Sequence, residues 1–408
     1  MDSTVPERSI LKPVSHLLWF GLLLCSLAVG VGCQSSAVPA AATEAPPAVG
    51  ASSALASAAD HKLTDTARVL AGLRPAPTSP LAGVAARPEW QAWQKEFDNQ
   101  WTQATRDRFV HMMAWRDQEL TPVTGTCTTL MYPFSGPDIL NAWLLFPNCK
   151  RYILFGLEQP GSLPALDQLS ADRLTALLEE TRHALNDLLA RNYFITRHML
   201  VDTAAQELHG TLPLMAVFLV RMNAELVSVR DVEVGEDGQL RGRTSAVKER
   251  RAAPALELVF ARPGHEPQTV IYFRARAEDR VVNERPGILL FLEQEAPFAT
   301  FLKSASYLLH GNQFTLVRSL LLRKSRLVLE DDSGIPLRFL KTPDWNVTLY
   351  GKYEKPVKDF NYGYQVDMAK AYADERAVKP LTFSFGYHWE ADSAAVILAV
   401  RHPSPPVQ

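Results

Sequence analysis

Hydrophobic and polar positions divide the 408-residue chain into three zones of different character. One continuous apolar run extends from Leu17 to Gly32, and residues 34–60, which follow it, have almost no large apolar side chain. These residues include eleven Ala together with Pro and Ser, so they bury too little surface to offset the entropy cost of ordering. We therefore expect a disordered tether over residues 33–61 and a globular region over residues 62–408.

The globular region begins with helical periodicity over residues 62–117. A short helix is predicted at Thr64–Leu73 and a long amphipathic helix at residues 88–116. One face of the long helix carries apolar side chains at spacings of three and four, namely Trp90, Trp93, Phe97, Trp101 and Ala104. Such an aromatic stripe is typical of a face that packs on a core, so we expect it to be structural.

Residues 118–224 contain the clearest local fold signal. Thr126–Phe134 is predicted to be a buried strand, Ile139–Phe146 a helix and Lys150–Leu157 a second strand. A strand-helix-strand unit of this kind requires parallel strands with a right-handed crossover, which is how a Rossmann-like fold begins. Two further helices are predicted, at Ser170–Tyr193 with a serine N-cap and at Leu212–Asn223.

Residues 225–408 have the pattern of strands separated by turns. Asp237-Gly238 and Pro263-Gly264 predict two hairpins. The hairpin strands are expected at Glu225–Val234 with Gln239–Ser245, and at Leu256–Ala261 with Thr269–Ala277. The later elements are predicted as strands at Ile288–Leu292, Leu327–Glu330, Ile335–Leu340, Val347–Tyr353, Leu381–Tyr387 and Ala394–Val400, and as helices at Phe298–Leu309 and Phe314–Arg323. The whole region predicts an α/β or α+β fold with a mixed, partly parallel sheet and helices on both faces.

The overall composition narrows the class of protein. Hydrophobic residues make up 47% and charged residues 21% of the chain, which is an ordinary globular mixture. The formal net charge is −2, so we expect no nucleic-acid partner. No apolar run after Gly32 reaches spanning length, because Leu212–Val220 has only nine residues.

The amino-terminal apolar run has the features of a secretion signal. Its sixteen residues are fewer than the roughly 20 that a membrane-spanning helix needs. It ends in Leu27-Ala28-Val29-Gly30-Val31-Gly32-Cys33, which resembles the lipobox that lipoprotein signal peptidase reads before a diacylated cysteine. We expect residues 1–32 to be a lipoprotein signal peptide and Cys33 to bear lipid. A non-lipidated signal peptide and an uncleaved anchor are the alternatives.

The residue after Cys33 bears on the expected location. Gln34 rather than Asp occupies this position, which favours the outer membrane by analogy with enterobacterial sorting. We therefore expect an exported protein that is lipid-anchored to the cell envelope and faces the periplasm.

Cysteine usage fits an oxidising compartment. Cys25 lies in the signal and Cys33 is assigned to lipid, which leaves Cys127 and Cys149 as a pair. Both precede the two predicted parallel strands, so they lie at the same edge of the sheet. A disulfide and two buried free thiols are both open, and the sequence has no Cys/His metal pattern.

The turn after the first strand of the βαβ unit carries the first candidate site. Ser135 and Asp138 lie in this turn, and Glu158 ends the second strand, where an acidic residue binds ribose hydroxyls in Rossmann-like folds. The turn has one glycine, Gly136, and Pro137 lacks an amide donor, so we expect no dinucleotide cofactor. A small-ligand site at the strand ends stays open, beside the interpretation that Ser135 and Asp138 only cap the helix.

Two further clusters combine residues suited to chemistry. Asp331 and Asp332 are adjacent carboxylates that could bind a cation or act as acid and base, and they equally suit a tight turn between strands. Lys303 precedes Ser304 and Ser306 on a predicted helix, where it could activate a nucleophile or lie on a structural face. The sequence has no Gly-x-Ser-x-Gly, His-Glu-x-x-His or Walker motif.

Four segments together resemble an uncharacterised family of bacterial exported proteins. They are Tyr-Pro-Phe-Ser-Gly-Pro-Asp at 132–138, Phe-Gly-Leu-Glu at 155–158, Lys-Ser-Ala-Ser-Tyr at 303–307 and Asp-Asp-Ser-Gly-Ile-Pro at 331–336. The resemblance covers roughly residues 88–390. It implies no activity, cofactor or catalytic residue.

Two hypotheses about function follow from these patterns. In the first, an envelope lipoprotein binds a small ligand or a partner protein without catalysis. In the second, a periplasm-facing enzyme, most simply a hydrolase, uses carboxylates at the strand ends. The candidate carboxylates are Asp138, Glu158, Asp331 and Asp332. The enzyme requires at least two of them to converge on one open pocket, preferably beside Lys303 or Ser135.

Overall fold

A computed structural model describes most of the expected globular region. The described residues are 60–194, 199, 202, 204, 207–243, 252–374, 376–388 and 393–402. The predicted signal peptide, Cys33 and nearly all of the predicted tether lie outside these residues. None of the helices in these ranges is both long and apolar enough to cross a membrane.

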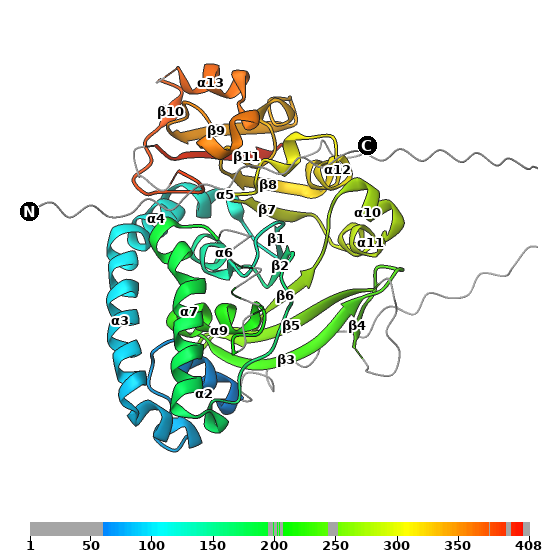
Figure 1. Cartoon of the computed structure of the whole chain (residues 1–408). Helices are drawn as coiled ribbons and strands as arrows, with labels where there is room; N and C mark the ends of the chain where they lie inside the picture. The colour runs from blue at the N-terminus through cyan, green and yellow to red at the C-terminus, as the bar shows by residue number, and fades with distance from the viewer. Residues whose placement is uncertain are drawn as a thin grey trace, which may run out of the picture. The chain divides into compact units, whose positions relative to one another are not determined.

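The centre of the structure is one mixed sheet of eleven strands (Figure 1). The strands are β1 Thr129–Tyr132, β2 Arg151–Gly156, β3 Glu225–Val234, β4 Leu240–Gly242, β5 Ala253–Ala261, β6 Gln268–Arg274, β7 Phe298–Leu302, β8 Ser325–Glu330, β9 Trp345–Gly351, β10 Val378–Lys379 and β11 Ala395–Arg401. Their order across the sheet is β10-β9-β11-β8-β7-β1-β2-β6-β5-β3-β4.

The middle five strands, β6-β2-β1-β7-β8, are all parallel. When these five are numbered along the chain, their spatial order is 3-2-1-4-5. Along the chain, β2 and β6 therefore add to one side of β1, and β7 and β8 then add to its other side. The direction reverses between β1 and β7, which makes this gap the topological switch point of the sheet.

Antiparallel strands extend the parallel centre on both sides. The hairpins β3–β4 and β5–β6 continue the sheet beyond β6. On the other side β11 pairs antiparallel with both β8 and β9. The two predicted hairpins and the predicted parallel βαβ pair are therefore confirmed.

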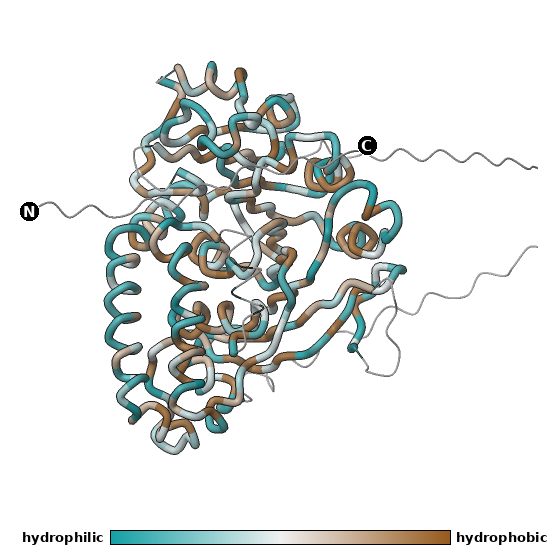
Figure 2. The backbone as a smooth tube through the Cα atoms, viewed as in Figure 1, coloured by the Kyte–Doolittle hydropathy of each residue, from teal (hydrophilic) through white to brown (hydrophobic). Residues whose placement is uncertain are grey.

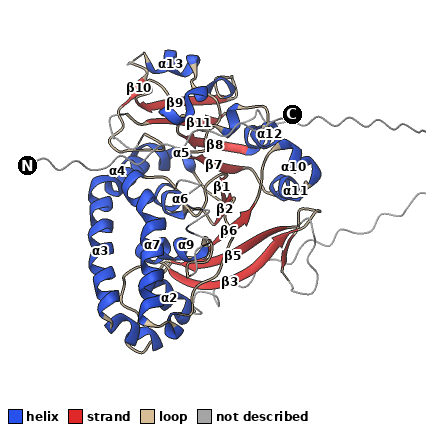
Figure 3. Ribbon diagram, viewed as in Figure 1, coloured by secondary structure: helices blue, strands red, loops and turns tan. Residues whose placement is uncertain are grey.

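Helices cover both faces of this sheet (Figures 1 and 3). The first layer contains α2 His61–Leu70, α3 Pro88–Ala104, α4 Val110–Trp115, α6 Ile139–Leu145, α7 Ala171–Arg191 and α9 Leu212–Arg221, with α5 Thr121–Thr124 beside it. The second layer contains α11 Gly287–Gln294, α12 Thr315–Lys324 and α13 Val366–Tyr372, with α10 Asp279–Glu284 packed on α11 and α12. The predicted fold class, a mixed partly parallel sheet with helices on both faces, is confirmed.

Alternating side chains of the strands reach the two cores. In β1, Leu130 and Tyr132 join the core under the first layer, whereas Met131 joins the core under the second. In Figure 2 the outward side of α3 is hydrophilic while the central strands are largely hydrophobic. The predicted aromatic stripe of α3 is structural, because Trp90 and Trp93 are buried and donate hydrogen bonds to carbonyls of α2. The predicted long helix at 88–116 continues through π-helical turns at Thr105–Phe109 and Arg116–Leu120.

A disulfide joins the segments that precede β1 and β2. It links Cys127 to Cys149, whose Cα atoms are 4.5 Å apart. Both cysteines are buried in the core under the first helix layer. The bond therefore ties the two strands together at the edge opposite to their carboxyl ends.

Two elements in residues 225–408 are of a different type from the one predicted. Phe298–Leu309, predicted to be a helix, is the strand β7 followed by a loop and a 3-10 helix at Leu308–His310. Ile288–Leu292, predicted to be a strand, lies inside the helix α11. A strand buried on both faces has a continuous apolar run without alternation, and such a run cannot be distinguished from a short buried helix by periodicity.

Two predicted strands are not formed. Ile335–Leu340 contains a 3-10 helix at Leu337–Phe339, and Leu381–Tyr387 has only an isolated bridge between Phe385 and His388. Both segments are largely buried, so their apolar residues reflect packing on the core rather than a sheet. The segment after Asp331-Asp332 is therefore not the second arm of a strand turn.

Candidate functional site

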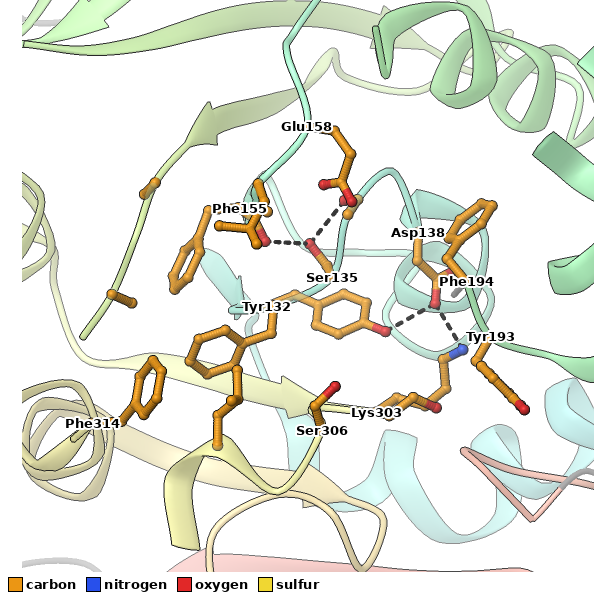
Figure 4. Close-up of a pocket in the computed structure, with 18 of the residues that line it drawn as sticks. Tyr132, Ser135, Asp138, Phe155, Glu158, Tyr193, Phe194, Lys303, Ser306 and Phe314 are labelled. Atoms are coloured by element: carbon orange, nitrogen blue, oxygen red, sulfur yellow. Dashed lines mark hydrogen bonds and ion pairs between the residues drawn. The ribbon is translucent and has the colours of Figure 1, made fainter. Parts of the chain in front are cut away.

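A pocket opens at the carboxyl ends of β1, β2, β6 and β7, over the switch point of the sheet (Figure 4). Its cavity volume is about 200 Å³. In open parallel sheets, ligand sites lie at this position. Four predicted candidates, Ser135, Asp138, Glu158 and Lys303, line this one pocket.

One wall of the pocket is apolar and aromatic. Phe134 contacts Phe155 edge to face at 5.3 Å between ring centroids, and Phe314 at 5.8 Å. Phe194 and Leu308 also line the pocket. This combination of an apolar wall with a few polar groups is typical of sites for small organic molecules.

The polar floor is organised around a buried ion pair that bridges the switch point. Lys303, directly after β7, places its Nζ 2.9 Å from Oδ2 of Asp138, which follows β1. Both side chains are at most 2% exposed. The hydroxyl of Tyr132 donates to the same carboxylate oxygen at 2.9 Å (Figure 4). The side-chain amide of Asn141 donates to both oxygens. A buried charge pair of this kind is stable only with such additional hydrogen bonds.

Asp138 has two structural roles, one for each carboxylate oxygen. Its Oδ1 accepts from the backbone amide of Asn141, so it caps the helix α6 as predicted. Its Oδ2 holds Lys303 and Tyr132. Capping alone therefore does not describe this residue. Ser135, by contrast, does not cap the helix.

Lys303 lies in surroundings that disfavour its charge. Burial lowers the pKa of Lys303, Asp138 opposes this shift, and the nearby Arg108 adds to it. The ammonium also donates to the backbone carbonyl of Asn192, at the carboxyl end of α7. The amine is therefore fixed in position between three elements that are far apart in the sequence.

Glu158 is a buried carboxyl that is folded back over two glycines. A Cβ atom at Gly156 would lie 2.3 Å from its Oε2, and one at Gly136 would lie 3.7 Å away. The hydroxyl of Tyr272 lies 3.2 Å from the same oxygen. Burial raises the pKa of Glu158, and its hydrogen bonds oppose this shift. The group can therefore hold a proton closer to neutral pH than an exposed glutamate does.

Ser135 ties the turn after β1 to the end of β2. Its amide donates to the carbonyl of Phe155 at 3.0 Å, and its hydroxyl donates to the carbonyl of Gly136 at 3.0 Å. Within the described ranges no histidine, lysine or carboxylate hydrogen-bonds to this hydroxyl. Ser135 thus has the surroundings of a positioning or ligand-binding group rather than of an activated nucleophile.

The predicted pair Asp331 and Asp332 does not line the pocket. Asp331, at the end of β8, accepts from the amide of Ser304 at 2.8 Å and from the amide of Ser333 at 2.9 Å. Asp332 accepts from the hydroxyl of Tyr307 at 2.5 Å. Both residues are 1% exposed. Their carboxylates accept hydrogen bonds from the 303–307 loop, which carries Lys303. The expectation of a tight turn between two strands is wrong at these residues, because no strand follows them.

Backbone strain gathers in the two loops that form the pocket. Phe134 has a φ of 59°, and Ser304, Ser306 and Tyr307 have φ values of 54°, 53° and 54°. A left-handed conformation costs such residues on the order of 1–3 kcal/mol each, and it persists only where the surroundings impose it. Here the supporting carboxylates and the stacked ring of Tyr387 impose it, and strain of this kind concentrates at functional sites.

Sequence reasoning missed several residues of the site. Tyr132 lies in the segment at 132–138, but no pattern in that segment marks it as a partner of Asp138. Arg108 approaches from the helical layer and Tyr272 from β6, and nothing in their local sequence marks them. Arg108 lies in a π-helical turn, and π-turns are frequent at functional sites.

No protein-family model matches the sequence, and comparison with curated proteins and with solved structures likewise gives no match. Among the described residues no group of three or more His, Cys, Asp or Glu side chains is arranged to hold a metal ion.

Proposed function

We propose that the chain binds a small organic molecule in the pocket over the switch point. The observation that carries this proposal is the convergence of Ser135, Asp138, Glu158 and Lys303 on one pocket at the carboxyl ends of the parallel strands. These residues come from three separate strand ends, and the buried ion pair costs free energy that a purely structural core would avoid with apolar residues. A ligand site explains why the polar groups and the strained loops occur together.

A second candidate function is acid–base catalysis on the bound molecule. It is favoured by Glu158, whose pKa burial raises and whose carboxyl lines the pocket. In a hydrolysis Glu158 would donate its proton to the leaving group while a water molecule adds to the electrophilic atom. The proton that the water loses would then restore the acid. Asp138 is paired with Lys303, so it would hold Lys303 in place and balance its charge rather than transfer a proton.

The cellular location of the protein is also a proposal. We propose that the protein is exported and anchored through a diacylated Cys33, so that the pocket faces the periplasm on a flexible tether. This rests on the lipobox-like sequence that precedes Cys33 and on the Ala-rich segment that follows it. Mass spectrometry of the mature amino terminus, with Cys33→Ala as the comparison, tests it. A mature chain that begins elsewhere would overturn the anchor.

Native mass spectrometry of the full-length protein from detergent tests the binding proposal. We expect a bound small molecule that is lost from Leu308→Trp, because the half-buried Leu308 lines the pocket and an indole there would fill it. Glu179→Gln, on the exposed face of α7, is the control and should keep the ligand. A ligand retained at full occupancy by Leu308→Trp would place it elsewhere and refute the proposal.

Turnover is tested on the same material. A purified protein that hydrolyses a panel of esters, amides and glycosides should lose most of that activity in Glu158→Gln and keep it in Glu179→Gln. Binding without any turnover in the wild-type protein would leave the non-catalytic function and exclude hydrolysis of that panel.

A further inference from the structure

We propose that the part of the pocket over β1 and β2 is a nucleoside site, in which Glu158 binds the ribose hydroxyls and the aromatic wall holds the base. This inference rests on the proposed ligand-binding function and names the class of ligand.

The position of Glu158 in the sheet is the first argument. The parallel strands have the order 3-2-1-4-5, which is that of the doubly wound nucleotide-binding folds. In those folds the ribose is held by a carboxylate at the end of the second strand, about 20 residues after the glycine turn. Glu158 follows β2, the second strand, and lies 22 residues after Gly136 in the turn beyond β1.

The surroundings of the carboxyl group are the second argument. Gly136 has a φ of +53°, and Gly156 has no room for a Cβ because Glu158 Oε2 and the Cα of Gly136 lie too close. The two strand ends therefore present bare backbone beside the carboxylate. Tyr272 fixes the orientation of that carboxylate through its hydroxyl. Glu158 lines the pocket, so sugar hydroxyls bound there would approach this carboxylate from the side of the two glycines.

The adjoining wall suits a planar base. Phe134, Phe155 and Phe314 form a connected aromatic surface, and the small residues Ala275 and Ala277 after β6 line the same pocket. Every nucleobase has a π-face that can stack on aromatic rings, so such a wall favours nucleosides with little discrimination among bases.

The charges of the described lining disfavour a phosphorylated ligand. Among the residues that the structure describes, the charged lining consists of Asp138, Glu158 and Glu278 against the single cation Lys303. Lys303 is already committed to Asp138, which also accepts from the Asn141 amide of α6. A phosphate would meet these carboxylates and, within the described part of the chain, no second cation, whereas a neutral or cationic substituent at the 5′ carbon would meet no such repulsion. The site is therefore one for a nucleoside rather than for a nucleotide or dinucleotide.

Calorimetric titration of the full-length protein in detergent tests the inference. The probes are adenosine, guanosine, cytidine, uridine and S-adenosylhomocysteine, with the 5′-monophosphate of each of the four nucleosides as the phosphorylated comparison. We expect at least one nucleoside to bind and its 5′-monophosphate to bind about tenfold more weakly or worse, because the phosphate meets like charges in the lining.

A two-by-two comparison isolates the ribose contact. The 2′,3′-dideoxy form of the bound nucleoside should bind the wild-type protein about tenfold more weakly, because the charge-assisted hydrogen bonds to Glu158 are lost. Glu158→Gln should weaken the parent nucleoside similarly and should show no further loss with the dideoxy form. Glu179→Gln should behave as the wild type.

The outcomes separate this inference from the function on which it rests. Equal binding of the dideoxy form, or binding of no nucleoside to a protein whose pocket holds another small molecule by native mass spectrometry, would refute the nucleoside site alone. No small molecule in the pocket, together with no nucleoside binding, would refute both.

Discussion

The pair formed by Asp138 and Lys303 shows how a single contact can organise a site. Each side chain is almost completely removed from solvent, yet each keeps hydrogen-bond partners besides the other. Burying two charges costs several kcal/mol per ion, on the order of what their attraction returns. The pair therefore adds little net stability but fixes β1 and β7 in one relative position.

Breaking this pair on one side should be costly. Lys303→Met leaves the carboxylate of Asp138 buried without its counter-charge, so we expect the free energy of unfolding to fall by about 3–5 kcal/mol. Chemical denaturation of the purified protein measures this. Lys370→Met, at an exposed position of α13, should change stability little.

The double variant Asp138→Asn with Lys303→Met separates charge from packing. It should be less destabilised than the sum of the single variants, because neither charge is left alone. Additive losses would show that the two charges do not interact in the folded protein.

At the scale of elements, the sequence predicted best where the pattern was local. The βαβ unit, both hairpins and the helices α7, α9 and α12 follow from periodicity, a capping serine and turn residues. The strand β7 could not be predicted in this way, because Phe298–Leu302 is buried on both faces and shows no alternation. Its misassignment as a helix also hid the role of Lys303, which became visible only as the first residue after a parallel strand.

The sequence predicted the candidate site only in part, because some of its contacts follow from local patterns and others do not. Ser135, Asp138 and Glu158 follow predicted strands, and carboxyl ends of parallel strands meet at one edge, so their convergence was foreseeable. The separation of Asp331 and Asp332 from the pocket depends on the packing of the 303–307 loop. That packing arises from contacts with Ser304 and Tyr307 that no local pattern encodes.

The disulfide is an element-scale constraint with a measurable effect. Cys127 and Cys149 are separated by 22 residues, so their bond restricts the unfolded chain around α6. We expect the double variant Cys127→Ser with Cys149→Ser to lose about 3 kcal/mol of unfolding free energy. Denaturation of the wild type with and without a reductant is the matched measurement. An unchanged midpoint in both comparisons would show that the bond contributes nothing.

At the scale of the whole molecule, the carboxylates behind the 303–307 loop couple stability to pH. Burial and the neighbouring Asp332 raise the pKa of Asp331 to about 6, above its usual value of 3.8. The folded protein therefore holds a proton that the unfolded chain releases over this window. The contribution of this group is fully present below pH 3.8 and is lost as the pH rises through about 6.

Asp331→Asn provides the test of this coupling. The difference in stability between wild type and variant should be most favourable to the wild type near pH 4 and should shrink as the pH rises through about 6. Melting curves at several pH values measure it. A difference that stays constant or grows over this range would contradict the raised pKa.

The position of β1 also has a consequence for how the molecule is made. Leu130 pairs with Tyr152 on one side and with Ala299 on the other. During synthesis the β1–β2 unit is available early, but the second edge of β1 stays unpaired until β7 has emerged. Contacts of such high sequence separation form late and slowly, and an open strand edge invites pairing with other chains. This edge is therefore exposed to mispairing while the chain is incomplete, and the pocket forms only when β7 has joined the sheet.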